Sequence, residues 1–367
     1  MNEQISSNKS RNLKEYSEKK LVLNSNPSFA WFALTSRCNM MCEHCPVVRK
    51  SEENADIIEE VYERFCKEIL PTLEEVTIGA NNYGEQLLSK RIVNFLERTN
   101  NEGVKVKIWT NGTLLTGEVL DKLIEVNADV TISIEGADKN YSDIRHIPYS
   151  IFKSNLNNLI LERNKKKKSL SVVLRFTAFK SNLNDLFKLL DLGIDAINIG
   201  YLQPKNSEWQ SKSFNFDEIK QLESQFIPSL IEKAKEKNVK IKFTNIYQGA
   251  EATKSASSCG DPWMRISVRE NGDILPCCVA GDSLIMGNLA KKHFKEIWNG
   301  KRYIAFRKSF IDCKLKSTCR ICSGLYSSKG YGIWDWCQKQ VKSVLLRFRL
   351  YKILKFLTSV KRRIYRL

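Results

Sequence analysis

Six strand-like segments alternate with six helix-like segments over the first two thirds of the chain, and this alternation limits the fold more than any other feature. Regular β/α alternation requires parallel strands joined by right-handed crossovers. The predicted strands cover 29–34, 75–79, 104–109, 129–134, 170–177 and 196–200, and the predicted helices cover 55–70, 87–99, 117–126, 150–163, 183–192 and 217–237. We therefore predict an α/β fold, a partial (β/α)6 TIM-like barrel, with functional loops at the carboxyl ends of its strands.

The pattern changes after residue 240, where the chain becomes rich in cysteine and has few long periodic segments. Asn271-Gly272 between two short apolar runs is a hairpin signal. We expect a small α+β domain here. The predicted division is a polar N-terminal extension over 1–27, the barrel over 28–240, the cysteine-rich domain over 241–337 and a basic tail over 338–367.

The chain has eleven cysteines, no apolar run long enough to cross a membrane, and no apolar signal segment at its N-terminus. These features predict a cytoplasmic protein, in which disulfides are disfavoured and clustered cysteines bind metals or catalyse reactions. Cys66 stands apart from the clusters on a predicted helix, and we expect it to be a core residue.

The first cysteine cluster is Cys38, Cys42 and Cys45, spaced C-x3-C-x2-C directly after the first predicted strand. Three thiolates on one loop can bind three irons of a [4Fe–4S] cluster and leave the fourth iron open to a small molecule. The alternative is a zinc knuckle completed by His44, although structural zinc sites use four closed ligands.

Together with motifs after later strands, this loop resembles the radical S-adenosylmethionine (radical SAM) enzymes over about residues 28–335. Segment 78–88 is similar to the family's Gly-Glu-Pro motif, with Gln86 in place of proline and Tyr83 in place of a second glycine. Thr110-Asn111-Gly112 after the third strand also matches. Segment 133–137 resembles Ser-Ile-Asp-Gly-Ala, and segment 141–145 resembles the Tyr-x3-Arg that follows it.

The resemblance implies roles for these positions. The backbone around Gly84 would hold the amino group of SAM, and Ser133 would face its ribose. Arg145 would pair with the SAM carboxylate, which suits a bidentate guanidinium. The implied cofactor-binding residues are Gly84, Glu85, Asn111, Ser133, Glu135 and Arg145.

In the second cysteine cluster, seventeen residues separate Cys259 from Cys277, and Cys319-x2-Cys322 follows later. This pattern resembles the SPASM/twitch modules of many radical SAM enzymes, in their shorter form with a single auxiliary [4Fe–4S] cluster. Four thiolates also suit zinc, which is the alternative. Cys313 or Cys337 could replace one of the four ligands, and Cys278 is either a packing residue or a catalytic hydrogen donor. The implied auxiliary ligands are Cys259, Cys277, Cys319 and Cys322.

The family resemblance implies that SAM is cleaved to methionine and a 5′-deoxyadenosyl radical, which abstracts hydrogen from substrate. An electron donor such as flavodoxin or ferredoxin would supply the electron, and the auxiliary cluster would accept or relay one. Too few residues precede the first strand for a leader-binding domain, which favours a small-molecule or sugar-like substrate. We favour dehydrogenation, with epimerisation or peptide modification as alternatives.

The net charge of +18 is concentrated in the tail, where residues 341–367 hold nine Lys and Arg and no acid. The body is only mildly basic, so a nucleic-acid partner is unlikely from charge alone. Apolar residues every three or four positions predict an amphipathic helix, which either packs on protein or contacts an anionic membrane surface. A rival of another class is a non-catalytic metal-binding module that uses this tail on membrane or nucleic acid.

Overall fold

The computed structural model describes residues 3–42, 44–45, 55–79, 84–202, 207–244, 259–320 and 322. The chain divides into two compact units. The larger combines 1–249 with 260–308, and the smaller combines 250–259 with 309–367. The basic tail over 338–367 and Cys337 lie outside the described residues.

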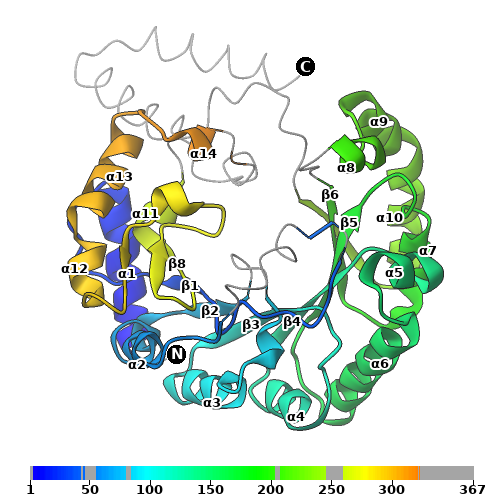
Figure 1. Cartoon of the computed structure of the whole chain (residues 1–367), viewed down its shortest axis with the longest axis horizontal. Coiled ribbons are helices and arrows are strands. Elements are labelled where there is room, and N and C mark those ends of the chain that lie inside the picture. The colour runs from blue at the N-terminus through cyan, green and yellow to red at the C-terminus, as the bar shows by residue number, and fades with distance from the viewer. Residues whose placement is uncertain are drawn as a thin grey trace, which may run out of the picture. The chain divides into compact units, whose positions relative to one another are not determined.

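A ten-stranded sheet forms the centre of the larger unit, as far as its residues are described (Figure 1). The strand order is β10-β9-β8-β1-β2-β3-β4-β5-β6-β7, and the neighbours from β8 to β7 in that order are parallel. The predicted α/β fold with a parallel sheet is confirmed. The bounds are β1 (Phe29–Phe32), β2 (Glu75–Ile78), β3 (Lys105–Thr110), β4 (Asp129–Ile134), β5 (Val172–Ala178), β6 (Ala196–Tyr201), β7 (Lys240–Thr244), β8 (Arg265–Val268), β9 (Asp273–Leu275) and β10 (Gly287–Asn288).

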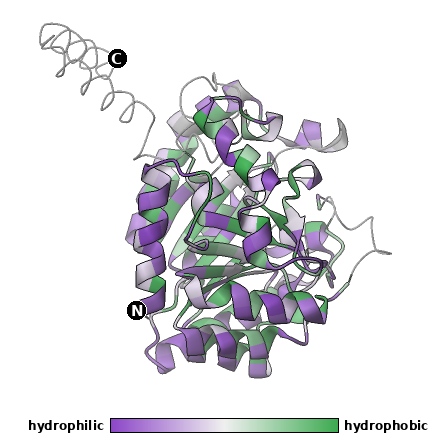
Figure 2. Ribbon diagram, turned by 90° about the vertical axis from the view of Figure 1, so that its left-hand side faces the viewer, coloured by the Kyte–Doolittle hydropathy of each residue, from purple (hydrophilic) through white to green (hydrophobic). Residues whose placement is uncertain are grey.

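Helices cover the convex side of the curved sheet, where α3, α4, α6, α7 and α10 follow one another (Figure 1). The reason lies in strand alternation: Val172, Leu174 and Phe176 of β5 are completely buried, whereas the residues between them are half-buried on the opposite, inner face. In Figure 2 the strands are mainly hydrophobic, and the helices over them carry both hydrophilic and hydrophobic residues. The inner face is therefore the one left for polar groups.

The helices have the following bounds: α1 (Glu3–Ser17), α2 (Glu59–Glu68), α3 (Ile92–Glu102), α4 (Gly117–Glu125), α5 (Asp138–Arg145), α6 (Tyr149–Lys165), α7 (Asp185–Leu189), α8 (Ser207–Lys212), α9 (Phe216–Gln221), α10 (Ile227–Glu236), α11 (Asp261–Met264), α12 (Phe294–Trp298), α13 (Lys301–Ile311) and α14 (Ser317–Arg320). The single helix predicted over 217–237 is interrupted by a π-helical turn, η5 (Leu222–Phe226). Pro228 follows at the start of α10, and because proline has no N–H it cannot continue the preceding hydrogen-bond ladder.

The segment predicted as a polar extension over 1–27 contains α1, which packs on the larger unit through polar side chains. Asn8, Asn12 and Glu15 are buried on one helix face. The Asn12 amide donates to the carbonyl of Trp263 (2.6 Å) and to the Ser25 hydroxyl (3.0 Å). Hydrogen bonds to main chain and hydroxyls allow the polar groups of this extension to be buried.

The separate domain expected over 241–337 stays a prediction. Residues 260–308 of that range belong to the same compact unit as the barrel. Strand β8 pairs in parallel with β1, with Phe29 opposite Arg265, and fully buried Ile266 extends the core. The predicted hairpin is present between β8 and β9. Gly272 in its turn has φ +88°, a conformation that glycine adopts readily.

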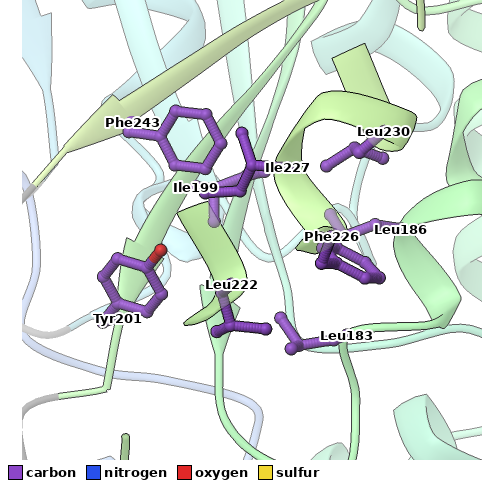
Figure 3. A pocket seen from close by; sticks show the side chains of 9 residues that line it. All are labelled: Leu183, Leu186, Ile199, Tyr201, Leu222, Phe226, Ile227, Leu230 and Phe243. Atoms are coloured by element: carbon purple, nitrogen blue, oxygen red, sulfur yellow. The ribbon is translucent and has the colours of Figure 1, made fainter. Parts of the chain in front are cut away.

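Nine side chains surround an apolar gap of about 10 Å³ between β6, β7 and the helices α7, η5 and α10 (Figure 3). Ligand sites occupy about 300–1,000 Å³, so this gap is a packing defect and not a substrate site. Within the described residues, no helix is long and apolar enough to cross a membrane.

Candidate active site

The loop after β1 carries the three cysteines Cys38, Cys42 and Cys45 at the carboxyl edge of the sheet. Burial raises the pKa of the Cys42 thiol to about 11. Arg145 opposes this rise, whereas Glu135 and then Cys45 and Cys38 add to it. Among the described residues, no three His, Cys, Asp or Glu side chains are close enough to hold one metal ion. A [4Fe–4S] cluster needs less convergence, because each thiolate binds a different iron. An all-thiolate loop with one missing ligand fits such a cluster.

Asparagines connect this cysteine loop to the end of β3. The Asn111 amide donates to the Asn39 side-chain oxygen (2.8 Å), and the Asn39 amide donates to the Thr113 hydroxyl (2.9 Å). Asn39 lies between Cys38 and Cys42. Predicted to bind cofactor, Asn111 thus has an observed contact that positions the cysteine loop.

The buried Gln86 amide connects the motif after β2 to the end of β1. Its oxygen accepts from the Leu34 N–H (2.7 Å), and its nitrogen donates to the Thr35 carbonyl (2.9 Å). Gln86 is completely buried. The residue that departs from the family's proline therefore makes main-chain hydrogen bonds that a proline side chain cannot make.

Gly84 lies against the same stretch of backbone. A Cβ atom at this position would be 2.6 Å from the Thr35 carbonyl oxygen and 3.0 Å from the Ser36 backbone. No larger residue fits without moving main chain. Only glycine allows this close approach between the motif after β2 and the start of the cysteine loop.

The buried Glu85 carboxylate joins the ends of β2 and β3. It accepts from the Asn111 N–H (2.6 Å), the Thr110 hydroxyl (2.8 Å) and the Leu87 N–H (3.1 Å). Burial raises the pKa of Glu85, and these hydrogen bonds oppose the rise. The Glu85 carboxylate accepts hydrogen bonds from three protein donors. In this structure Glu85 therefore holds the ends of β2 and β3 together.

Glu135 and Arg145 form a buried ion pair beside the cysteine loop. The Arg145 guanidinium is bidentate, with Nε 2.5 Å and Nη2 2.9 Å from the Glu135 oxygens, and Nη1 is 3.7 Å from the Met40 sulfur. Burial opposes ionisation, but Arg145 and then His44 lower the pKa of Glu135 to about 2. The guanidinium predicted to bind the SAM carboxylate is thus engaged with Glu135 in this structure.

His44 approaches this pair from the cysteine loop. Its Nε2 is 3.4 Å from a Glu135 oxygen, and its ring meets Trp209 edge to face at a centroid distance of 6.0 Å. Ser133, near the end of β4, is half-buried on the inner face of the sheet. The residues predicted after β2, β3 and β4 therefore share the carboxyl edge with the first cysteine cluster.

The auxiliary cysteines are distributed over both compact units. Cys277 follows β9 in the larger unit, and burial, then Asp261, raises the pKa of its thiol. Cys259, Cys319 and Cys322 belong to the smaller unit, where the Cys322 N–H donates to the Cys319 carbonyl in one turn. The proposed four-ligand set and the role of half-buried Cys278 stay predictions.

Two family models match the chain. Residues 32–193 match the Radical SAM superfamily, and residues 259–323 match the SPASM iron–sulfur cluster-binding domain. The chain belongs to the radical SAM superfamily. It is an iron–sulfur enzyme, and its two domains imply [4Fe–4S] clusters and SAM as cofactors.

Two characterised proteins align with most of this radical SAM chain. A tungsten-containing aldehyde ferredoxin oxidoreductase cofactor-modifying protein from Pyrococcus furiosus is 25% identical over 79% of this chain and 88% of its own length. An AdoMet-dependent heme synthase from Methanosarcina barkeri is 24% identical over 82% and 90%. The crystal structure of Streptococcus suis SuiB bound to S-adenosylmethionine has a TM-score of 0.63 at 16% identity, covering 87% of this chain and 76% of SuiB, and shows a shared fold.

Sequence reasoning missed two kinds of residue in this radical SAM core. Asn39 and Met40 are spacers between cysteines, and a spacing motif gives them no role. Arg175 and Asn198 are polar residues inside the apolar strands β5 and β6. That polar interruption was a usable signal, because a strand with one face on helices keeps its polar residues for the other face.

Proposed function

We propose that this radical SAM enzyme removes hydrogen from a C–H bond of a small-molecule or sugar-like substrate, and that the overall reaction is a dehydrogenation. The observation that carries the proposal is the three-cysteine loop at the carboxyl edge of the parallel sheet, held there by Asn111, Gln86 and the close approach of Gly84. When bound, the clusters and SAM supply the one-electron chemistry, including acceptance of an electron from the substrate.

The protein's own residues position this chemistry. Gln86 and Asn111 fix the two sides of the cysteine loop, and Glu85 holds the ends of β2 and β3 together. The Glu135–Arg145 pair is buried beside the loop. Buried surroundings on that side would help to protect a reactive species from side reactions.

Two relatives support a small-molecule substrate, since one is named for modifying a cofactor and the other for making heme. The half-buried polar residues on the inner face of the sheet are also suited to a small polar ligand. A peptide substrate is the main competing possibility and is one outcome of the tests below.

The first test is dithionite-driven release of 5′-deoxyadenosine after anaerobic reconstitution. Cys42→Ala is expected to abolish release, because one cluster ligand is lost. Cys66→Ala is the matched control, since Cys66 is buried on α2 among Val61, Tyr62 and Phe65 and lies outside the cysteine loop. Release by Cys42→Ala at the wild-type rate, or equal loss in both variants, contradicts the proposed function.

The second test distinguishes the reaction types by mass spectrometry in deuterated water. Dehydrogenation gives a product two hydrogens lighter and no deuterium at carbon. Epimerisation gives an unchanged mass in ordinary water and one deuterium in heavy water, and either a peptide product or solvent deuterium overturns this part of the proposal.

A further inference from the structure

One row of polar side chains crosses four adjacent strands on the inner face of the sheet. The register places Ser133 of β4 beside Arg175 of β5. It then places Arg175 beside Asn198 of β6, and Asn198 beside Lys242 of β7. Because neighbouring strands are about 4.8 Å apart, the backbones of Arg175, Asn198 and Lys242 lie roughly 5, 10 and 14 Å from that of Ser133.

The orientation of this row follows from its strand neighbours. Ile199 and Phe243, which follow Asn198 and Lys242 in sequence, line the apolar gap against the helices (Figure 3). Successive side chains of a strand point to opposite faces. Asn198 and Lys242 therefore point to the inner face, the same face as Ser133.

The row has the chemistry of a binding surface. The Asn198 side-chain oxygen is buried and has no hydrogen-bond partner among the described residues. Leaving a buried acceptor unsatisfied is destabilising, so the position is suited to a donor from a ligand. Arg175 is half-buried, and burial lowers its pKa without removing its charge. Lys242 is exposed and makes no ion pair within the described part of the chain.

We infer that Arg175, Asn198 and Lys242 bind the substrate, and that the substrate carries an anionic group together with a hydroxyl or amino donor. The guanidinium of Arg175 matches a carboxylate or a phosphate bidentately, and Lys242 adds a second positive charge. The donor meets the Asn198 oxygen. This inference rests on the proposed function, because it places the substrate next to Ser133, the residue expected to face SAM.

Three small probes test the inference on the reconstituted holoprotein with SAM: glycerate, glycerol 3-phosphate and glycerol. They share hydroxyl donors and differ in charge, so the first two distinguish a carboxylate site from a phosphate site. Isothermal titration calorimetry should show at least one anion binding tenfold or more tightly than glycerol. A wild type without this preference overturns the inference.

Substitutions in the row test whether these side chains bind the anion. Arg175→Gln and Asn198→Leu should each weaken the preferred anion about tenfold or more, and Lys242→Gln about two- to fivefold, because exposed charges are screened. Arg175→Lys keeps the charge and should recover part of the affinity. Lys107→Gln is the matched control, since Lys107 lies on the inner face but pairs with Glu75 (2.8 Å), and it should bind within twofold of wild type.

Iron content and melting temperature verify that each variant folds. Equal affinity in wild type and all row variants overturns the inference, as does an equal loss in Lys107→Gln. Failure of the proposed function gives a different result, a wild type that binds the anion but releases no 5′-deoxyadenosine from SAM.

Discussion

Two regions of the larger unit bury polar side chains in different ways. On α1, the Asn8 amide donates to the carbonyls of Asn26 and Thr72 (both 3.1 Å), and the Glu15 carboxylate accepts from the N–H groups of residues 24 and 25. These bonds attach a helix to main chain. Beside the cysteine loop, the side chains of Glu135 and Arg145 bond to each other, and they also contact the loop residues His44 and Met40, respectively.

The two regions also differ in which buried polar atoms have no hydrogen-bond partner. At the cysteine site, His44 Nδ1 and the Tyr141 hydroxyl are buried without partners among the described residues, whereas none of the buried polar atoms of Asn8, Asn12 or Glu15 is in that state. Native proteins pair nearly all buried polar atoms, so these two atoms are candidates for contacts with a bound molecule. Buried polarity alone therefore does not identify a site, because the buried polar groups of α1 are fully paired.

Breaking the Glu135–Arg145 ion pair should have the largest effect on stability and on SAM binding. Arg145→Leu leaves the Glu135 charge buried without a partner, and we expect a loss of about 3–5 kcal/mol in unfolding free energy and no measurable SAM binding. Adding Glu135→Gln removes the unpaired charge and should restore at least half of the stability, but not SAM binding. Urea unfolding and SAM titration measure the two effects. A double variant as unstable as Arg145→Leu would show that buried charge is not the cause.

The close approach at Gly84 provides a sharper test of the site region. Gly84→Ala must displace the backbone at Thr35, and such overpacking costs about 1–3 kcal/mol. We expect SAM affinity to fall about tenfold. Gly281→Ala is the control, because a Cβ there meets nothing within 4 Å. Similar SAM affinity in both variants would show that the close approach at Gly84 is not needed for SAM binding.

Two buried amides test the comparison directly. Gln86→Met and Asn12→Leu each remove main-chain hydrogen bonds from a completely buried side chain, so each should lose about 1–3 kcal/mol. Only Gln86→Met should also lose iron faster to a chelator, because Gln86 holds the start of the cysteine loop. Equal iron loss in the two variants would mean that the two regions do not differ in function.

Lowering the pH should produce the smallest of these changes in unfolding free energy. The pKa of Glu135 is about 2 when folded, below the unfolded value of about 4.3, so its stabilisation is present above pH 4.3 and is lost as pH falls toward 2. The stability gap between wild type and Glu135→Gln should narrow by about 1 kcal/mol from pH 5 to pH 3.5. Glu63→Gln, which breaks an exposed pair with Arg98, should change stability by less than about 1 kcal/mol throughout. A Glu135 gap independent of pH would contradict the assigned pairing.

The parallel sheet could be predicted because its signal is local and repeated. Each strand from β1 to β6 overlaps its predicted range, since apolar runs such as Val172–Ala178 and the alternation with helices specify that pattern. The interruption at η5 and the short helix α5 were missed. Both depend on contacts with neighbouring elements, and periodicity does not reveal those contacts.

The sequence predicted where the site residues lie in the fold, but it did not predict which side chains contact one another. Spacing placed Cys38, Cys42 and Cys45 on one loop, and strand ends placed Glu85 and Glu135 near it. That Glu85 serves three protein donors, or that Glu135 pairs with Arg145, depends on side-chain directions that a linear motif does not encode.

The parallel pairing of β8 with β1 has a consequence for how the chain reaches its native state. Strand β1 lies inside the sheet only after residues 265–268 have been synthesised, and the Asn12–Trp263 hydrogen bond joins residues 251 positions apart. Contacts of such long range slow folding, and an unpaired strand edge invites association with other chains. During synthesis on the ribosome, the barrel therefore has an open edge at β1 until the C-terminal segment arrives to cover it.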